Sequence, residues 1–245
     1  MKTILGGNSH TGALMMAQRK QPVIQDFEVI PFGSGLFEMA PFSMVEKGRV
    51  LFTAERFKEN LSQFASLEYI DPNIRWGLCM GTHTGRIFGQ EMWQKSDPSA
   101  VLSEGRRPIS LAILDAMIEQ DQRYIRQFIL QLVENGVSCF VVSCPPPRED
   151  HFCLSTGVRP ETVLYIDQRA RKLYQDWLAN AGVPFVDYPR QVLTPEGFLK
   201  PALAQGRLAD GKKDPHHANA RYGSHMLLKI RNEMGLDGLS QVTAD

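Results

Sequence analysis

Short apolar runs alternate with segments of helical periodicity along the chain, and this alternation constrains the fold more than any other feature of the sequence. The apolar runs have the length of buried strands and cover residues 3–5, 27–32, 74–80, 137–143 and 183–188. Segments with apolar residues at three- and four-residue steps cover residues 11–19, 55–67, 112–134, 163–178 and 220–234. Parallel strands need such crossover helices and are buried on both faces. The sequence therefore predicts an α/β fold, a three-layer α/β/α sandwich around a flavodoxin-like, five-stranded parallel sheet.

Residues 43–52 interrupt this alternation. Glu46-Lys47-Gly48 stands at their centre between two short apolar stretches, which is typical of a tight turn between antiparallel strands. We therefore expect a small hairpin inserted beside the main sheet. The chain has 245 residues and no internal repeat or low-complexity stretch, which suits one α/β unit with long loops. We predict a single domain that spans residues 1–245.

Charge and hydropathy exclude several classes of partner. Lysine plus arginine and aspartate plus glutamate are equal at 27 each, so the chain has no net positive field to attract nucleic acid or an anionic membrane. No segment is apolar over the length of a bilayer, and the first ten residues lack the apolar stretch of a signal peptide. Four cysteines lie in or just after apolar runs, as small buried thiols do. We expect a cytoplasmic protein with a small-molecule partner, no nucleic acid and no membrane.

The turn between the first predicted strand and the first helix carries Asn8, Ser9 and His10. A hydroxyl at this joint lies at the carboxyl edge of the sheet, and the backbone N–H of Ser9 lies at a helix N-terminus. Such an N–H can donate to an oxyanion, so the position suits a nucleophile. Serine and asparagine are also common helix caps, and the turn by itself leaves both interpretations open.

A second signal lies just before the last helix, in Asp214-Pro215-His216-His217. A carboxylate three residues ahead of a histidine can accept a hydrogen bond from one ring nitrogen while the other nitrogen faces outward. This arrangement fixes the tautomer that a general base needs. A solvated loop with a chance pair of histidines has the same sequence, so the motif alone is weak evidence.

Taken together, these two signals and the order of strands and helices between them resemble the SGNH (GDSL-like) hydrolase superfamily. The resemblance extends from Ile4 to about Met234. Members of that family begin with a G-D-S block, and Gly7-Asn8-Ser9 matches it with asparagine in place of aspartate. The family forms an oxyanion hole from the serine N–H, a glycine N–H after the second strand, and an asparagine side chain in a G-x-N-D block after the third strand.

The resemblance implies a serine esterase that works through an acyl-enzyme. Ser9 would attack the ester carbonyl, His217 would take its proton, and Asp214 would stabilise the imidazolium. Water would release the acyl group in a second step. No metal and no organic cofactor are implied. The substrate would be a small acyl ester, of which an O-acetyl group on a carbohydrate is one example.

The oxyanion hole is where the sequence departs most from the family. By position the glycine is Gly35, or Gly33 if the register of the loop differs, and Ser9 supplies its own N–H. The third block reads Gly81-Thr82-His83-Thr84, with histidine where the family has asparagine. We expect the ring N–H of His83 to replace the amide with a different reach and pH response. The alternative is that His83 only orients a neighbouring loop.

Three further side chains are candidates for substrate binding because they lie near these motifs. They are His10, Arg148 and His216. His10 follows the nucleophile, His216 precedes the expected base, and Arg148 follows the proline run that ends the fourth strand. For the two histidines, packing or a surface position is the competing interpretation. For Arg148 the competing interpretation is a rigid exit from the strand.

Three rival functions remain open from the sequence. An O-acyltransferase would use the same triad and pass the acyl group to an alcohol instead of water. A catalytically silent member of the family would bind an acylated ligand without cleaving it. A metal-dependent enzyme would take its ligands from a set of clustered side chains, namely His83, Asp214, His216 and His217.

Overall fold

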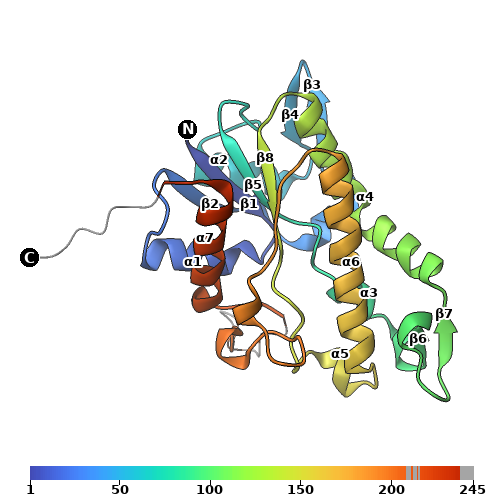
Figure 1. Ribbon diagram of the computed structural model, residues 1–245. Coiled ribbons are helices and arrows are strands. Elements are labelled where there is room, and N and C mark those ends of the chain that lie inside the picture. Colours follow the sequence, from blue (N-terminus) through green and yellow to red (C-terminus); the bar gives the residue numbers. More distant parts are fainter. Residues whose placement is uncertain (208–210, 212–213, 215, 238–245) are drawn as a thin grey trace, which may run out of the picture.

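A five-stranded parallel sheet lies at the centre of the computed structural model, which describes residues 1–207, 211, 214 and 216–237 (Figure 1). Its strands in spatial order are β2 (Phe27–Pro31), β1 (Thr3–Gly7), β5 (Arg75–Cys79), β8 (Cys139–Val142) and β9 (Phe185–Val186). All neighbouring strands are parallel. Because β1 lies between β2 and β5, the chain reverses its direction of travel across the sheet there, and ligands bind at the carboxyl ends of such strands.

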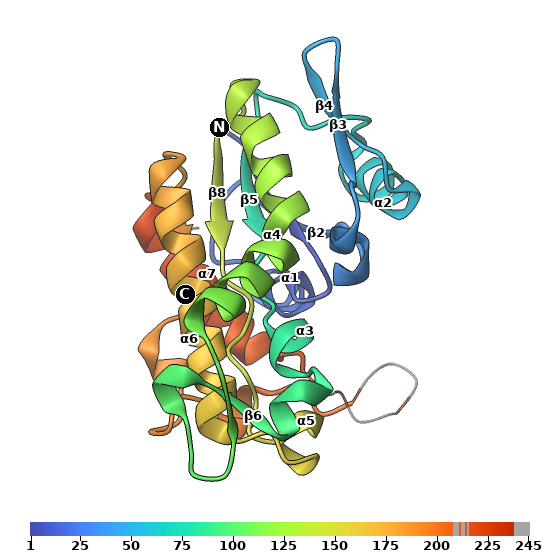
Figure 2. The ribbon, with the colours of Figure 1, turned by 90° about the vertical axis from the view of Figure 1, so that its right-hand side faces the viewer.

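Helices cover both faces of this sheet, so the predicted three-layer sandwich is confirmed (Figures 1 and 2). One face carries α1 (Thr11–Lys20) and α7 (Ala220–Met234). The other face carries α2 (Glu55–Ala65), α4 (Leu111–Glu134) and α6 (Pro160–Asn180). Strand residues alternate between the two apolar cores: Leu5 packs in the core on the side of α1 and α7, and Ile4 packs in the core on the side of α2, α4 and α6. This alternation fixes which turn residues face outward at the ends of the strands.

The predicted hairpin is present as β3 (Ser43–Glu46) paired antiparallel with β4 (Arg49–Phe52). It projects past α2 at one end of the molecule (Figure 2). Aromatic packing fastens its base, since the ring centroids of Phe42 and Phe52 lie 5.3 and 5.5 Å from that of Phe128 on α4. The hairpin is therefore attached to the face opposite α1.

Small elements beyond the carboxyl edge of the sheet were not predicted from the sequence. They are α3 (Gly85–Phe88), β6 (Ser96–Pro98), β7 (Arg107–Ile109) and α5 (Phe152–Ser155), with the short 3₁₀ turns η2 (Glu91–Gln94) and η3 (Ser99–Val101) between them. β6 and β7 pair in parallel. Asp97 in β6 is fully buried and forms ion pairs with Arg106 and Arg159. These elements form a third apolar cluster with α4 and α6 and complete the wall near the carboxyl ends of the strands.

The first strand, β1, continues through Gly6 and Gly7, two residues beyond the apolar run that predicted it. A Cβ atom on Gly6 would lie 2.1 Å from Cζ of Phe32, and one on Gly7 would lie 2.3 Å from the carbonyl oxygen of Cys79. Both positions pack too closely for a side chain, so glycine here continues the strand instead of breaking it. Consequently only Asn8 separates the strand from Ser9.

Two further features of the structure concern the length of its apolar helices and the state of its cysteines. Within the described residues, we find no helix whose length and apolar character would let it cross a bilayer. The four cysteines are free thiols, and three of them are buried while Cys139 is half-buried.

Candidate active site

The turn after β1 buries Asn8 and exposes Ser9. Asn8 is 1 % exposed, and its backbone N–H donates to the carbonyl oxygen of Cys79 at 3.3 Å. Its side-chain oxygen accepts from the backbone N–H of His10 at 3.1 Å, and its carbonyl oxygen accepts from the hydroxyl of Thr11 at 2.7 Å. These hydrogen bonds fix the buried side of the turn, so the Ser9 hydroxyl is held on the exposed side, at the carboxyl end of β1.

The hydroxyl of Ser9 lies 2.8 Å from Nε2 of His217, although 208 positions separate the two residues. Nδ1 of the same ring lies 3.0 and 3.1 Å from the two carboxylate oxygens of Asp214. The structure thus joins the three predicted residues in one hydrogen-bonded chain. The hydroxyl of Ser9 is directed at His217 and is not used to cap α1.

Asp214 is 1 % exposed and is also held by backbone donors. Its Oδ1 accepts from the N–H groups of His216 at 3.0 Å and His217 at 2.8 Å. Burial raises the pKa of this carboxyl, but the backbone and ring hydrogen bonds from these two residues outweigh it, and the net pKa lies below the usual value. Asp214 is therefore a carboxylate at neutral pH, the form that accepts a hydrogen bond from Nδ1–H of His217.

Arg148 anchors the segment that carries His217. Nη1 donates to the carbonyl oxygens of Gln205 at 2.9 Å and His217 at 3.2 Å. Nε and Nη2 each donate to a carboxylate oxygen of Asp150 at 2.8 Å. The side chain is only 5 % exposed. Arg148 was predicted as a candidate for substrate binding, but its guanidinium is occupied by these protein acceptors and holds the loop of the base.

A cavity of about 290 Å³ opens in front of Ser9. Its wall includes Gly35, His83, His10 and His216. The structure therefore brings together the residues that the resemblance implies for an oxyanion hole. Among the described residues it is Gly35, and not Gly33, that lines this cavity.

A buried polar network that the sequence did not reveal ties the Gly35 loop to the turn of Ser9. Nη1 of Arg86 donates to the carbonyl oxygen of Gly35 at 2.8 Å, and Nε and Nη2 bind Asp121 at 2.8 and 3.1 Å. Glu38 is fully buried and lies 3.5 Å from Nη2 of Arg86 through one oxygen. Its other oxygen accepts from Nδ2 of Asn8 at 3.0 Å. The two backbone segments that face the cavity are thus linked through one carboxyl group.

The protonation of Glu38 follows from its surroundings. Burial raises its pKa to about 8, against the opposing effect of the Arg86 guanidinium. A protonated carboxyl can still accept from Asn8, so the link survives in the neutral form. No periodicity or motif marks Glu38 or Arg86 in the sequence; the only hint was the glycine pair at positions 33 and 35, which permits a close approach of backbone.

Four histidine rings lie close together beside the cavity, and three of them, His10, His83 and His216, line it. Their centroids lie 4.5 Å apart for His10 and His83, 5.2 Å for His83 and His216, 4.2 Å for His216 and His217, and 4.9 Å for His217 and His10. Nε2 of His10 lies 2.8 Å from Nδ1 of His83, so one ring donates to the other. The sequence indicated all four histidines as candidates, but it did not predict that their side chains form one closed cluster.

Burial and mutual repulsion keep three of these imidazoles uncharged. Burial lowers the pKa of His10 and His83 well below the usual value, and each is lowered further by neighbouring imidazoles. The pKa of His216 is lowered to about 4, first by burial and then by His217. The cavity therefore has neutral rings on its walls at neutral pH, which can donate from one nitrogen and accept at the other.

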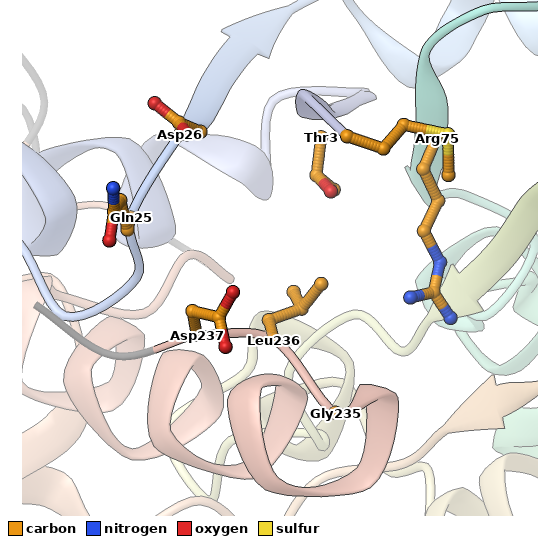
Figure 3. A pocket seen from close by; sticks show the side chains of 8 residues that line it. Thr3, Gln25, Asp26, Arg75, Gly235, Leu236 and Asp237 are labelled. Atoms are coloured by element: carbon orange, nitrogen blue, oxygen red, sulfur yellow. The ribbon is translucent and has the colours of Figure 1, made fainter.

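Another hollow, of about 210 Å³, lies at the opposite edge of the sheet, near the start of β1 and β5. Figure 3 shows Thr3 and Arg75 on one side of it and Leu236 and Asp237 on another. Nη1 of Arg75 is bound to the carbonyl oxygen of Met234 at 3.0 Å. The residues that line this hollow include no serine and no histidine, so the chemistry concentrates at the carboxyl edge.

Comparison with known proteins gives the class of fold. No protein-family model and no curated protein matches this sequence. A solved structure from Streptococcus pneumonia, described by the words platelet activating factor, is similar with a TM-score of 0.53 at 12 % identity over 96 % of this chain and 85 % of that one. A GDSL-like lipase from Bacteroides thetaiotaomicron has a TM-score of 0.48 at 13 % identity, covering 96 and 87 %. The acetyl xylan esterase AlAXEase has a TM-score of 0.48 at 11 % identity, covering 95 and 99 %.

The chain shares its three-layer α/β/α fold with the solved structure that has the TM-score of 0.53. At such identities the likeness establishes the fold alone, so an activity has to be argued from the side chains around Ser9.

Proposed function

We propose that this protein is a serine-dependent esterase that cleaves a small acyl ester through an acyl-enzyme. One observation carries the proposal: Ser9 Oγ, His217 Nε2 and Asp214 form a continuous hydrogen-bonded chain, with 2.8 Å between the hydroxyl and the imidazole. A nucleophile, a base and a group that orients the base are the parts that acyl transfer to serine requires. They stand at the edge of the sheet where ligands bind in this class of fold.

The first half of the reaction acylates the serine. Ser9 Oγ forms a bond to the carbonyl carbon of the ester as its proton passes to Nε2 of His217. Asp214, ionised at neutral pH, stabilises the resulting imidazolium through Nδ1–H. The bond to the alcohol oxygen then breaks, and that oxygen leaves with the proton from His217.

The second half returns the enzyme to its starting state. A water molecule takes the place of the alcohol and gives a proton to His217 while its oxygen attacks the acyl-serine. Collapse of the second tetrahedral intermediate releases the acid, and Ser9 regains its proton from His217. The two halves use the same residues, so neither needs a metal or an organic cofactor.

The negative oxygen of each tetrahedral intermediate needs donors that are already in place. We assign this task to the backbone N–H groups of Ser9 and Gly35 and to the ring of His83. Because Nδ1 of His83 faces His10, the proton that His83 can offer to the oxyanion is the one on Nε2. That tautomer requires His10 to donate from its own Nε2. His10 is then a positioning residue for His83.

The size and chemistry of the cavity support a small substrate. Its volume of about 290 Å³ is at the lower end of the range for ligand pockets. Polar groups from Ser34 and His216 stand among its walls, and they can bind the hydroxyl groups of a sugar. We therefore favour a short acyl group, and among such substrates an O-acetyl ester of a carbohydrate. The free thiols agree with the cytoplasmic location that we propose for the single-domain chain.

The test compares Ser9→Ala with a matched control, Ser62→Ala, at an exposed serine of α2. Hydrolysis of p-nitrophenyl acetate should fall by at least about 10³-fold in Ser9→Ala and stay at the wild-type rate in Ser62→Ala. A fluorophosphonate probe should label the wild-type protein at Ser9 only. Equal rates in Ser9→Ala and wild type, or a wild-type protein that neither turns over nor reacts with the probe, would contradict the proposal.

Two further arms of the experiment address the rival functions. Acyl transfer to an added sugar that outpaces hydrolysis would reassign the protein as an acyltransferase. Loss of turnover after exhaustive chelation, with recovery on adding metal, would reassign it as a metal-dependent enzyme. A panel of acetylated sugars with the same protein then identifies the alcohol partner.

A further inference from the structure

More imidazoles lie around the cavity in front of Ser9 than the proposed ester hydrolysis uses. Only His217 exchanges a proton with Ser9 in the proposed reaction, yet His10 and His216 stand directly beside it. One ring nitrogen from each of His10, His216 and His217 can be chosen so that the three lie within 4.8 Å of one another. His10 is buried and the other two are half-buried, so the three nitrogens converge at the wall of a cavity and not on an open surface.

Three converging imidazoles match the ligand preference of a small group of metal ions. Zn²⁺ binds histidine nitrogen at about 2.0–2.1 Å, which in a tetrahedral site puts neighbouring nitrogens about 3.4 Å apart. Nitrogens that start within 4.8 Å of one another reach this spacing by modest rotation of the side chains. Mg²⁺ and Ca²⁺ prefer oxygen ligands, so this constellation discriminates against them.

The hydrogen bonds of two of the rings leave a nitrogen for an ion. Nδ1 of His217 is bound to Asp214, the arrangement that commonly orients a histidine ligand, and its Nε2 points outward toward Ser9. Nε2 of His10 is bound to His83. Within the described chain, Nδ1 of His10 is buried and has no hydrogen-bond partner. A buried polar nitrogen without a protein partner is uncommon in native structures, and a water molecule or an ion is one of the groups that can satisfy it.

We propose that His10, His216 and His217 form a binding site for a divalent transition-metal ion of the Zn²⁺ type, and that an ion bound there blocks ester hydrolysis. The block follows because the lone pair on Nε2 of His217 cannot both coordinate an ion and accept the proton of Ser9. The hydroxyl of Ser9 or a water molecule takes the fourth position. The binding step stands independently, whereas the block rests on the proposed function.

Binding is tested first, by calorimetric titration of Zn²⁺ into the full-length protein after dialysis against a chelator. The wild-type protein should take up a single ion, with no uptake of Mg²⁺. His216→Asn should raise the Kd at least about tenfold, as loss of one ligand does. The matched control is His225→Asn, a histidine of α7 outside the cluster, and it should leave the Kd unchanged. Equal Kd values for wild type and His216→Asn would overturn the site.

Thermal unfolding gives a second readout that does not depend on activity and shows that the variants are folded. Saturating Zn²⁺ should raise the Tm of the wild-type and His225→Asn proteins, because an ion that binds only the folded state stabilises it. The Tm of His216→Asn should rise less at the same concentration. Equal increases in all three proteins would place the ion elsewhere and overturn the proposal.

The block is tested on the hydrolysis of p-nitrophenyl acetate. Zn²⁺ should inhibit the wild-type protein at concentrations near its Kd, a chelator should restore the rate, and the half-inhibitory concentration should rise in His216→Asn by the same factor as the Kd. Histidine-dependent binding with an unchanged rate would overturn the block. A protein that binds Zn²⁺ in this way but hydrolyses no ester would instead refute the proposed function, so the two failures are distinguishable.

Discussion

The two halves of the site are held in different ways. The half that carries Ser9 and Gly35 is attached to the sheet and to a buried network in which Glu38 joins Asn8 to Arg86. The half that carries His217 lies on a loop. Two hydrogen bonds to the carbonyl oxygen of His217 hold this loop, one from Arg148 and one from the N–H of Gln205. The register of the strands thus determines the position of the nucleophile, while a few polar contacts determine the position of the base.

Helix α7 connects the two halves. It begins directly after the loop of the base, where Asn219 caps it, and it packs side by side with α1, which begins two residues after Ser9 (Figure 1). The contact is close: a Cβ atom on Gly223 would lie 2.1 Å from the carbonyl oxygen of Ala13. Packing of α7 against α1 therefore brings Ser9 and His217 near each other, and the contacts of the loop set the final distance between them.

The largest expected effect on catalysis comes from Asp214→Asn, in the half of the site that carries the base. Asparagine can bind the wrong tautomer of His217, so kcat should fall by about 10³–10⁴-fold while the fold is kept. The rate with p-nitrophenyl acetate and the rate of fluorophosphonate labelling measure the loss. Asp176→Asn, at an exposed carboxylate of α6, is the control. A loss of less than tenfold would show that Asp214 does not orient the base.

A smaller effect should come from Arg148→Gln, which removes the anchor of the same half without touching the reacting atoms. We expect kcat to fall by roughly 10–100-fold with little change in KM, because a displacement of about 1 Å in a catalytic group costs up to about 10²-fold. Arg148→Lys should recover part of the rate, since it can still donate to the carbonyl oxygen of His217. Arg56→Gln, at an exposed arginine of α2, is the control. An unchanged kcat in Arg148→Gln would mean that the loop needs no such anchor.

A third effect concerns the half of the nucleophile and appears in stability, not in the catalytic rate. The pKa of Glu38 is raised from 4.5 to about 8 by burial, so between these values the folded state keeps a proton that the unfolded state has lost. The free energy of unfolding should therefore fall as pH rises through this window, by at most about 1.4 kcal/mol per pH unit from this group.

Glu38→Gln should abolish that contribution, because its amide does not titrate. Urea unfolding at pH 5, 6, 7 and 8 measures the slope for both proteins. Parallel slopes would show that Glu38 does not keep its proton in the folded state.

Local signals explain why much of the fold could be predicted. The last helix was predicted with its observed limits, Ala220–Met234, because its ends carry their own signals. Asn219 accepts from the N–H groups of the first turn, and Gly235 has a positive φ of 60° that suits glycine after a helix. The edge strand β9 is shorter than the apolar run that predicted it, because only two of its residues pair with β8.

Other parts could not be predicted because they depend on partners far away in the sequence. Phe64 follows the helical spacing of the buried face of α2 but is 39 % exposed, although Ala65 and Leu67 next to it pack against the core. Arg86 binds Gly35 and Asp121, which lie 51 and 35 positions away, and Glu38 binds Asn8 at a separation of 30. Charged residues in such segments look like a solvated surface until the fold closes over them.

The long separation between Ser9 and His217 also has a consequence for the newly made chain. The nucleophile leaves the ribosome 208 residues before the base. At about 5–20 residues per second, synthesis of that stretch takes roughly 10–40 s. During this interval the serine has no partner to accept its proton, so a growing or interrupted chain is chemically inert. Under the proposed function, ester cleavage therefore requires that α7 has docked against α1.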